Sequence, residues 1–432
     1  MNNFGNIVGY ENEKKELVSL RNLLLNYKKY DSMGIRIPRG VLLWGAPGVG
    51  KTVMARSIAT DGIHVVELRS ADCSQDASGA YISAAFEEAR RNPPALIIVD
   101  ELDKIANTSE RVFRSKNEEI MKILLTELES ERNGAGLMVV ATCNECDLIN
   151  QALLRTGRFD RIIEITTPSI EDRATIIRHY LSKLSIESRI DVNYLAKITV
   201  GNSGSYLECV INEAAIMALQ EGVGYIDMLM AQRAMNRIAF RALEGKLPVG
   251  DELWKIAVHE AGHAVVGALL LPRELTGATV IPCGGVRGHV NFAPSDDRSD
   301  SVSVMESRVK ISFAGSAAEE VILGERSSGE ISDLRNARKI MTMLVYGLGV
   351  YDIRFAGIYV TLPVSKNVSE YILSRGDEIY LAKMEEMYTA AKTILTENRD
   401  AVLAVARALV AKSALTSEEI FEICNAICSE SA

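Results

Sequence analysis

Short apolar runs interrupt the mixed sequence of the first 165 residues. Residues 41–44 read VLLW, residues 95–99 read ALIIV and residues 137–142 read LMVVAT. Apolar runs of this length are typical of strands that are buried on both faces. Residues 53–59, shortly after the first run, continue in a helical pattern. The pattern therefore predicts buried strands that are connected by helices in this part of the chain.

The second half of the chain has the patterning of helices. Residues 252–271 form one helical stretch that stops at Pro272. Residues 375–431 are rich in Ala, Leu and Glu, which predicts helices that serve structural packing. Between the two halves, the sequence GKLPVGDE contains two glycines and a proline and is typical of a linker.

Length and composition restrict the class of protein. A chain of 432 residues has room for two or three domains, and its net charge of −9 argues against nucleic acid as the main partner. No stretch approaches the roughly 20 apolar residues of a membrane helix. The first ten residues are polar and do not form a signal peptide. Together with seven scattered cysteines, expected as reduced thiols, these features predict a cytoplasmic protein.

Residues 45–52 read GAPGVGKT and lie between a predicted strand and a predicted helix. In such a P-loop the glycines allow backbone N–H groups to surround phosphates. Lys51 would contact the β- and γ-phosphates, and Thr52 would hold Mg²⁺. The alternative is a glycine-rich turn that precedes a lysine by chance. The strand–loop–helix order favours an ATP site.

Polar residues follow the next two apolar runs, where further ATPase groups are expected. Asp100 would act on the magnesium ion through its water shell, and Glu101 would polarise the attacking water. Asn144 follows the third run and is placed to contact the γ-phosphate. Arg155 and Arg158 lie in the segment ALLRTGRFDR and are candidate arginine fingers. The alternatives are a strand that ends in solvent and a solvated basic turn.

The sequence HEAGH at residues 259–263 indicates a zinc site in the second half. His259 and His263 are four residues apart on a helix, so both rings can bind one ion, and Glu260 lies beside them as a candidate base. A catalytic zinc ion needs a third protein ligand. Spacing alone leaves the third ligand open among His289, Asp296, Asp297, Asp300, Glu319, Glu320, Glu330 and Asp333.

The order GAPGVGKT, VDELDK, ATCN and ALLRTGRFDR resembles the AAA ATPase family. The resemblance implies a parallel sheet with helices on both faces in residues 1–165 and a helical lid in residues 166–243. It also implies rings of six subunits in which Arg155 and Arg158 reach a neighbour's nucleotide. The nucleotide-binding positions that it assigns are Ile7, Val8, Gly45, Ala46, Pro47, Gly48, Val49, Gly50, Lys51, Thr52, Val53, Asp100, His179, Gly204 and Ser205.

Residues 314–338 (AGSAAEEVILGERSSGEISDLRNAR) resemble the FtsH-type AAA metalloproteases. The resemblance implies a mostly helical zinc metallopeptidase domain in residues 244–432, with Asp333 as the third zinc ligand. Asp333 is expected to begin a helix, whose backbone N–H groups could orient its carboxylate. Glu319 and Glu320 would then support the site, contribute to an interface or lie on a solvated helix face.

The combined motifs predict an ATP-dependent zinc endopeptidase that acts on protein or peptide substrates with Zn²⁺, ATP and Mg²⁺. Zinc would lower the pKa of water toward about 7. Glu260 would take the proton of the attacking water and return it to the leaving amine. One alternative is a remodelling or chaperone ATPase with a structural or weakly active zinc domain. Another is a peptidase whose ATPase only assembles the ring. Glu260 argues against the first, and Glu101 with the arginines argues against the second.

Two features depart from the family pattern. The family usually carries two transmembrane helices ahead of the ATPase, which predicts here a soluble relative, a lost anchor or a membrane or adaptor partner. The family also places an aromatic–apolar–glycine triplet after the second strand. Residues 73–81 read CSQDASGAY without that triplet, and Tyr81 and Ile82 are expected to start the next helix. Substrates are therefore expected to be short, already unfolded or delivered by another component.

Overall fold

A computed structural model gives the structure of residues 3–69, 79–106, 114–130, 136–146, 149–155, 157–241, 245–283, 286–293, 300–327, 331–351 and 370–430. The chain divides into two compact units. The first comprises Met1–Ser185 and Gly201–Asn212, and the second comprises Ile186–Val200 and Glu213–Ala432. The division passes through residues 166–243, which the sequence predicts to be a separate lid.

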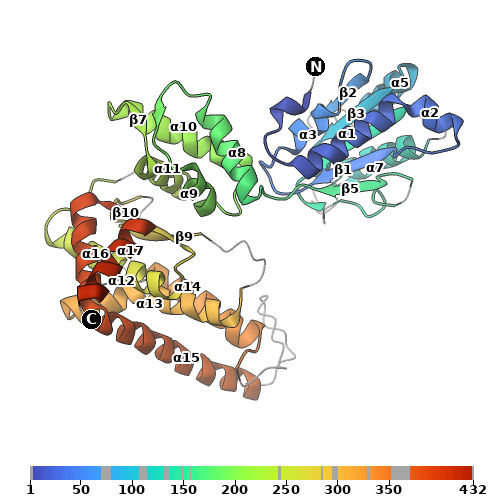
Figure 1. Cartoon of the computed structure of the whole chain (residues 1–432). Helices are drawn as coiled ribbons and strands as arrows, with labels where there is room; N and C mark the ends of the chain where they lie inside the picture. Colours follow the sequence, from blue (N-terminus) through green and yellow to red (C-terminus); the bar gives the residue numbers. More distant parts are fainter. Residues whose placement is uncertain are drawn as a thin grey trace. The chain divides into compact units, whose positions relative to one another are not determined.

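A parallel sheet lies at the centre of the first unit (Figure 1). Over the described residues it has five strands in the order β2-β3-β4-β1-β5. Each of the three apolar runs forms one of the three central strands, and β4 is buried at every position. The strands are β1 Gly40–Trp44, β2 His64–Arg69, β3 Ala95–Asp100, β4 Leu137–Cys143 and β5 Arg161–Glu164.

Helices cover both faces of this sheet, which confirms the predicted α/β fold (Figure 1). Apolar side chains of α5 and α7, including Phe86 and Leu124, pack with Ile97 and Val139 on one face. Helix α3 packs on the other face beside α1. The helices of this unit are η1 Asn3–Asn6, α1 Glu11–Leu25, α2 Tyr27–Ser32, α3 Lys51–Ser57, α5 Ala80–Arg91, α6 Leu102–Ala106, α7 Arg114–Glu129 and α8 Ile170–Leu181.

Three helices in residues 166–243 begin at side-chain caps. The hydroxyl of Ser169 accepts the Asp172 N–H at the start of α8, and the carboxylates of Asp191 and Asp227 cap α9 and α11 in the same way. Helix α10 crosses the division between the two units, which falls between Asn212 and Glu213. The elements of this region are β6 Glu187–Ser188, α9 Val192–Ile198, α10 Gly204–Gln220, β7 Tyr225–Ile226 and α11 Met228–Phe240.

The rest of the second unit is mostly helical, as predicted, around the long helices α12 and α13. These helices lie close together because the contact is made by small residues: a Cβ atom on Gly262 would lie 2.4 Å from the Ala314 carbonyl oxygen. Proline at residue 272 ends the predicted helix. The helices are α12 Asp251–Leu270, α13 Val302–Leu323, α14 Ile331–Thr342, η4 Met343–Gly347, α15 Glu370–Glu397, α16 Arg399–Lys412 and α17 Ser417–Glu430.

A small antiparallel sheet packs beside α12, and none of its strands was predicted from the sequence. The strands are β8 Leu275–Thr279, β9 His289–Phe292 and β10 Ala414–Thr416, in the order β10-β8-β9 over the described residues. The helical prediction for residues 375–431 is wrong at β10. Ser413 has a positive φ of 65° and ends α16, after which the backbone pairs with β8. In the described ranges, no helix combines the length and apolar character needed to span a membrane.

Candidate active sites

The predicted P-loop connects β1 to α3 in the first unit. Gly48 has a φ of +82°, a left-handed conformation that glycine adopts without strain. A Cβ atom at Gly48 would also lie 2.1 Å from the hydroxyl oxygen of Ser205. The backbone N–H of Ser205 donates to the Gly48 carbonyl oxygen at 3.3 Å. Ser205, in the first turn of α10, therefore lies against the loop, and Gly204 precedes it in the same turn.

Lys51 lies buried at the start of α3 and is held by acceptors of the loop. Its Nζ donates to the carbonyl oxygens of Gly45 and Ala46 at 2.7 and 2.8 Å and to Asn144 Oδ1 at 2.8 Å. Burial lowers the pKa of Lys51, and nearby acids, Asp103 foremost, oppose that shift. Lys51 and Asn144, distant in sequence, are thus brought together at the carboxyl ends of neighbouring strands.

Asp103 is a buried acid that the sequence analysis missed. Its Oδ2 accepts the backbone N–H of Asn144 at 3.1 Å. Asn144 Oδ1 in turn accepts a hydrogen bond from Lys51, so Asp103 supports the pair formed by Asn144 and Lys51. The signal was present in the third acid of VDELDK, residues 99–104.

Oxygen donors suited to Mg²⁺ meet next to the P-loop. The Thr52 hydroxyl donates to Asp100 Oδ1 at 2.8 Å, and the Thr142 hydroxyl donates to the same oxygen at 2.7 Å. Mg²⁺ prefers such hydroxyl and carboxylate oxygens. Glu101 follows with a positive φ of 55°, and its carboxylate pairs with Lys104 Nζ at 2.5 Å. The donor set therefore fits a magnesium ion beside bound phosphates.

The other predicted nucleotide contacts also lie in the first unit. Ile7 is buried, whereas Val8 and the α8 residue His179 are half-buried. The backbone N–H of Tyr10 donates to Asp172 Oδ1 of α8 at 2.9 Å. This bond ties the segment that contains Ile7 and Val8 to the helix that carries His179.

Arg155 and Arg158 have different surroundings. Arg155 is exposed. Arg158 donates to Glu129 Oε1 through Nε at 2.8 Å and Nη2 at 2.6 Å, and also to the Ala152 carbonyl oxygen. Most of the segment that lacks the family's aromatic–apolar–glycine triplet, residues 73–78 of 73–81, lies outside the described residues. Tyr81 and Ile82 lie in the first turn of α5, as predicted.

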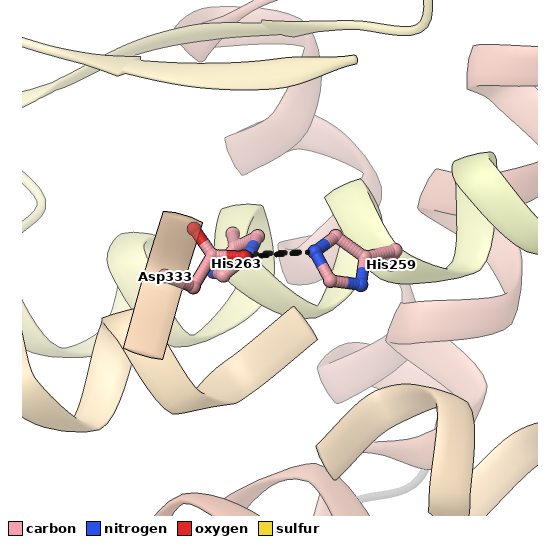
Figure 2. A group of neighbouring side chains, drawn as sticks. All are labelled: His259, His263 and Asp333. Carbon is pink, nitrogen blue, oxygen red and sulfur yellow. Dashed lines mark hydrogen bonds and ion pairs between the residues drawn. The ribbon is translucent and has the colours of Figure 1, made fainter. Parts of the chain in front are cut away.

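The second site lies where α14 meets α12, and its donor spacing fits zinc. Figure 2 shows Asp333 of α14 beside the rings of His259 and His263 of α12. The Nε2 atoms of the histidines are 3.2 Å apart, and Asp333 Oδ2 lies 3.1 Å from His259 Nε2 and 3.4 Å from His263 Nε2. Tetrahedral zinc bonds of about 2.0–2.1 Å require donor separations of about 3.3 Å. The three residues therefore fit a zinc ion.

Hydrogen bonds on the far sides of the rings fix their tautomers. His263 Nδ1 lies 2.6 Å from the Ile311 carbonyl oxygen, and His259 Nδ1 lies 2.8 Å from Glu319 Oε1. Both partners accept hydrogen bonds, so each Nδ1 carries a proton and each Nε2 is directed to the metal position. Ser327 holds Glu319 through its N–H at 2.5 Å and its hydroxyl at 2.8 Å. Glu319 thus orients a ligand, one of the roles that the sequence left open.

Glu260 is buried between the zinc ligands and the start of β9. A Cβ atom on Gly288 would lie 2.8 Å from Glu260 Oε1, so only glycine permits this approach. Burial raises the pKa of Glu260 to about 7, and the neighbouring histidines oppose the shift. The site opens into a cavity of about 1060 Å³. A carboxylate this close to the metal position is placed to exchange a proton with a water bound there.

The other candidates for the third ligand have different contacts. Asp300 pairs with Arg308, and Glu320 pairs with Lys392 at 2.7 Å. His289 lines the cavity with its ring against Phe240. Asp296, Asp297 and Glu330 lie outside the described residues. Among the described residues, Asp333 is the acid that joins both histidines in a metal-binding group.

Comparisons with known proteins match both halves of the chain. Residues 41–167 match the family model for ATPases associated with various cellular activities (AAA), and residues 250–423 match the model for peptidase family M41. The ATP-dependent zinc metalloprotease FtsH 2 of Symbiobacterium thermophilum is 31% identical over 98% of this chain and 74% of its own length. The ATP-dependent zinc metalloprotease FtsH of Caldicellulosiruptor bescii is 31% identical over 96% of this chain and 71% of its own length. The corresponding protein of Cupriavidus metallidurans is 32% identical over 97% and 68%. The chain therefore belongs to the FtsH family of ATP-dependent zinc metalloproteases.

Proposed function

We propose that the chain cleaves peptide bonds in protein substrates at a zinc ion held by His259, His263 and Asp333, and that ATP hydrolysis at the P-loop drives this cleavage. The donor spacing carries the proposal: separations of 3.1 to 3.4 Å match a tetrahedral zinc site, and a buried glutamate lies beside them. The sequences GAPGVGKT and HEAGH and the two matched family models support the same ATP-dependent peptidase activity.

Glu260 is the base of the proposed peptidase reaction. When bound, zinc supplies Lewis acidity that acidifies water and polarises the substrate carbonyl. Glu260 accepts the proton of the attacking water and donates it to the nitrogen of the departing amine. Its buried position excludes bulk water from this transfer. Glu319 keeps His259 in the tautomer that the site needs.

In the proposed ATPase reaction, the P-loop amides and Lys51 hold the phosphates, and Thr52 with Asp100 holds Mg²⁺. Glu101 orients the attacking water, and Asn144 contacts the γ-phosphate. The hydrogen bonds from Thr52 to Asp100 and from Lys51 to Asn144 support these assignments.

We further propose that the chain forms a ring of six identical subunits. In the ring, Arg155 reaches the nucleotide of the neighbouring subunit as an arginine finger. Arg158, from the same segment, acts on that nucleotide as a second arginine finger. The exposed position of Arg155 supports this role. Domain bounds of 1–165 for the large ATPase subdomain, 166–243 for the lid and 244–432 for the peptidase are part of the proposal.

Degradation of an unfolded protein by the wild type, Glu101→Gln and Glu260→Gln tests both activities, with zinc measured in each preparation. We expect Glu260→Gln to keep zinc and ATPase activity but to lose proteolysis. Glu101→Gln is expected to bind ATP, to hydrolyse it slowly and to lose ATP-stimulated proteolysis. Degradation by Glu260→Gln at the wild-type rate would contradict the peptidase assignment and favour a remodelling ATPase. Unchanged degradation by Glu101→Gln would contradict the ATP coupling.

A further inference from the structure

One face of helix α11 lies along the small sheet that borders the zinc site. Its residues Gln232, Asn236 and Phe240 are spaced four apart and therefore share a face. Gln232 Nε2 donates to the Thr276 carbonyl oxygen of β8 at 3.2 Å. Phe240 packs edge-on against the His289 ring of β9, with ring centroids 5.2 Å apart. The helix thus contacts two strands of the sheet.

Strand β9 is held between α11 and the zinc-binding helix α12. A Cβ atom on Gly267 of α12 would lie 2.7 Å from the ring of Phe292, so Phe292 faces α12. Because side chains alternate along a strand, His289 and Asn291 face the opposite side. Asn291 Nδ2 accordingly lies 3.5 Å from Asn236 Oδ1 of α11. Over the described residues β9 is the edge of its sheet, with β8 on one side.

This arrangement matters for catalysis because β9 begins directly after Gly288. The Gly288 backbone lies so close to Glu260 that a Cβ atom would be 2.8 Å from Glu260 Oε1. A shift of β9 by about 1 Å would therefore change the packing of the base. Misplacements of this size in supporting structure can lower rates about 100-fold.

The contact between α11 and the sheet contains several buried polar groups. Gln232 and Asn236 are buried polar residues, and neither ring nitrogen of His289 has a hydrogen-bond partner within the described ranges. Unpaired buried nitrogens weaken the contact. The face is therefore suited to a contact that changes during the reaction cycle.

Helix α11 is also joined to helix α10, which begins at the P-loop. Arg237 Nη1 of α11 donates to Glu213 Oε1 of α10 at 2.6 Å. The other end of α10 carries Ser205, whose N–H donates to the P-loop residue Gly48. Helix α10 is therefore one continuous element whose start touches the P-loop and whose later part holds α11. Rigid elements and packed side chains of this kind carry coupling between sites.

We propose that Phe240 and His289 form a positioning contact through which helix α11 holds strand β9 beside Glu260, and that nucleotide binding at the P-loop acts on the peptidase site through this contact. The inference rests on the proposed peptidase function for its kinetic consequence. Its structural part, the dependence of β9 on α11, does not need peptidase activity.

The test compares Phe240→Ala, His289→Ala and the double variant with Leu229→Ala in the full chain. Leu229 is an exposed apolar residue on the same helix and is the matched control. Phe240→Leu keeps an apolar side chain without the ring, which tests the contact if the alanine variant folds poorly. Each protein is checked for zinc content, for hydrogen exchange of the β9 amides and for kcat and KM on a short unstructured peptide, with and without ATP.

We expect Phe240→Ala to keep full zinc and to exchange its β9 amides about 3- to 10-fold faster, as lost ring contacts of this kind imply. Peptide kcat should fall by a similar factor with a smaller change in KM, and the double variant should match the stronger single variant. ATP should alter β9 exchange in the wild type and in Leu229→Ala but not in Phe240→Ala. Wild-type β9 exchange in Phe240→Ala, or an ATP response that persists there, would overturn the proposal. A wild type that shows the exchange pattern but cleaves no peptide would support the positioning contact and refute the peptidase function.

Discussion

Gly315 offers the sharpest test of the zinc site, because a side chain at this position would press on both histidine ligands. Gly315 lies on α13 opposite the zinc histidines. A Cβ atom there would lie 2.4 Å from His263 Nε2 and 2.5 Å from His259 Nε2. A zinc ion bound to these atoms would lie about 2.0–2.1 Å from each. In Gly315→Ala, the methyl group would therefore displace both nitrogen ligands from the positions that zinc needs.

Relief of this clash needs a movement of about 1 Å, since carbon atoms normally approach other heavy atoms to about 3.5 Å. The rings cannot turn freely, because Glu319 and the Ile311 carbonyl oxygen hold their far sides. Separation of α12 and α13 would also lose packing energy, because the two helices are in close contact at Gly262 and Ala314. Loss of the supporting contacts of one ligand weakens metal binding about 10- to 100-fold. With both histidines displaced, zinc affinity should fall at least about 100-fold, or about 2.8 kcal/mol.

A zinc titration against a competing chelator measures this loss. Far-UV circular dichroism and ATPase activity show whether Gly315→Ala remains folded. Gly224→Ala is the control, because a Cβ atom at that position meets nothing within 4 Å. We expect Gly224→Ala to bind zinc as the wild type does. A folded Gly315→Ala protein with wild-type zinc affinity would refute the placement of the two histidines around one ion.

Three further predictions follow from the contacts of the two sites. Glu319→Gln should weaken zinc binding about 10- to 100-fold in the same titration, because Glu319 orients a ligand; unchanged affinity would count against this role. In the metal-free protein, burial lowers the pKa of His259, but hydrogen bonds with two carboxylates outweigh burial and raise the pKa to about 10. Zinc must displace that proton, so its apparent affinity should rise up to about tenfold per pH unit from pH 7 toward 10, and a flat profile would contradict the assignment. Arg155→Ala should lower the ATPase rate about 1000-fold without changing Tm, whereas Arg158→Ala should also lower Tm slightly because Arg158 is paired within its own chain; full ATPase activity in Arg155→Ala would exclude it as the finger.

Local patterns were sufficient to predict much of the fold and part of each site. Buried parallel strands are continuous apolar runs, so the three central strands could be predicted from residues 41–44, 95–99 and 137–142. The four-residue spacing of His259 and His263 places both rings on one side of a helix whatever surrounds it. The P-loop could be predicted for the same reason, because its function depends on backbone conformation within one segment.

Contacts between distant segments could not be predicted from the same patterns. Spacing did not distinguish Asp333 from seven other candidates, because its approach to the histidines depends on how α14 packs on α13, which lies against α12. Strand β10 has only three residues, and its conformation depends on pairing with β8 rather than on its own composition. The support that Asp103 gives to Asn144 likewise appears only when β4 and the segment after β3 are brought together.

The central claim is that Glu260 acts as the base beside a zinc ion in a peptidase. It is tested most directly by kcat for cleavage of a short unstructured peptide by Glu260→Gln that carries one zinc ion per chain. We predict that kcat falls at least about 100-fold while zinc binding and ATPase activity are retained, because loss of a general base removes a contribution of this size. A zinc-loaded Glu260→Gln protein that cleaves the peptide at the wild-type rate would contradict the claim.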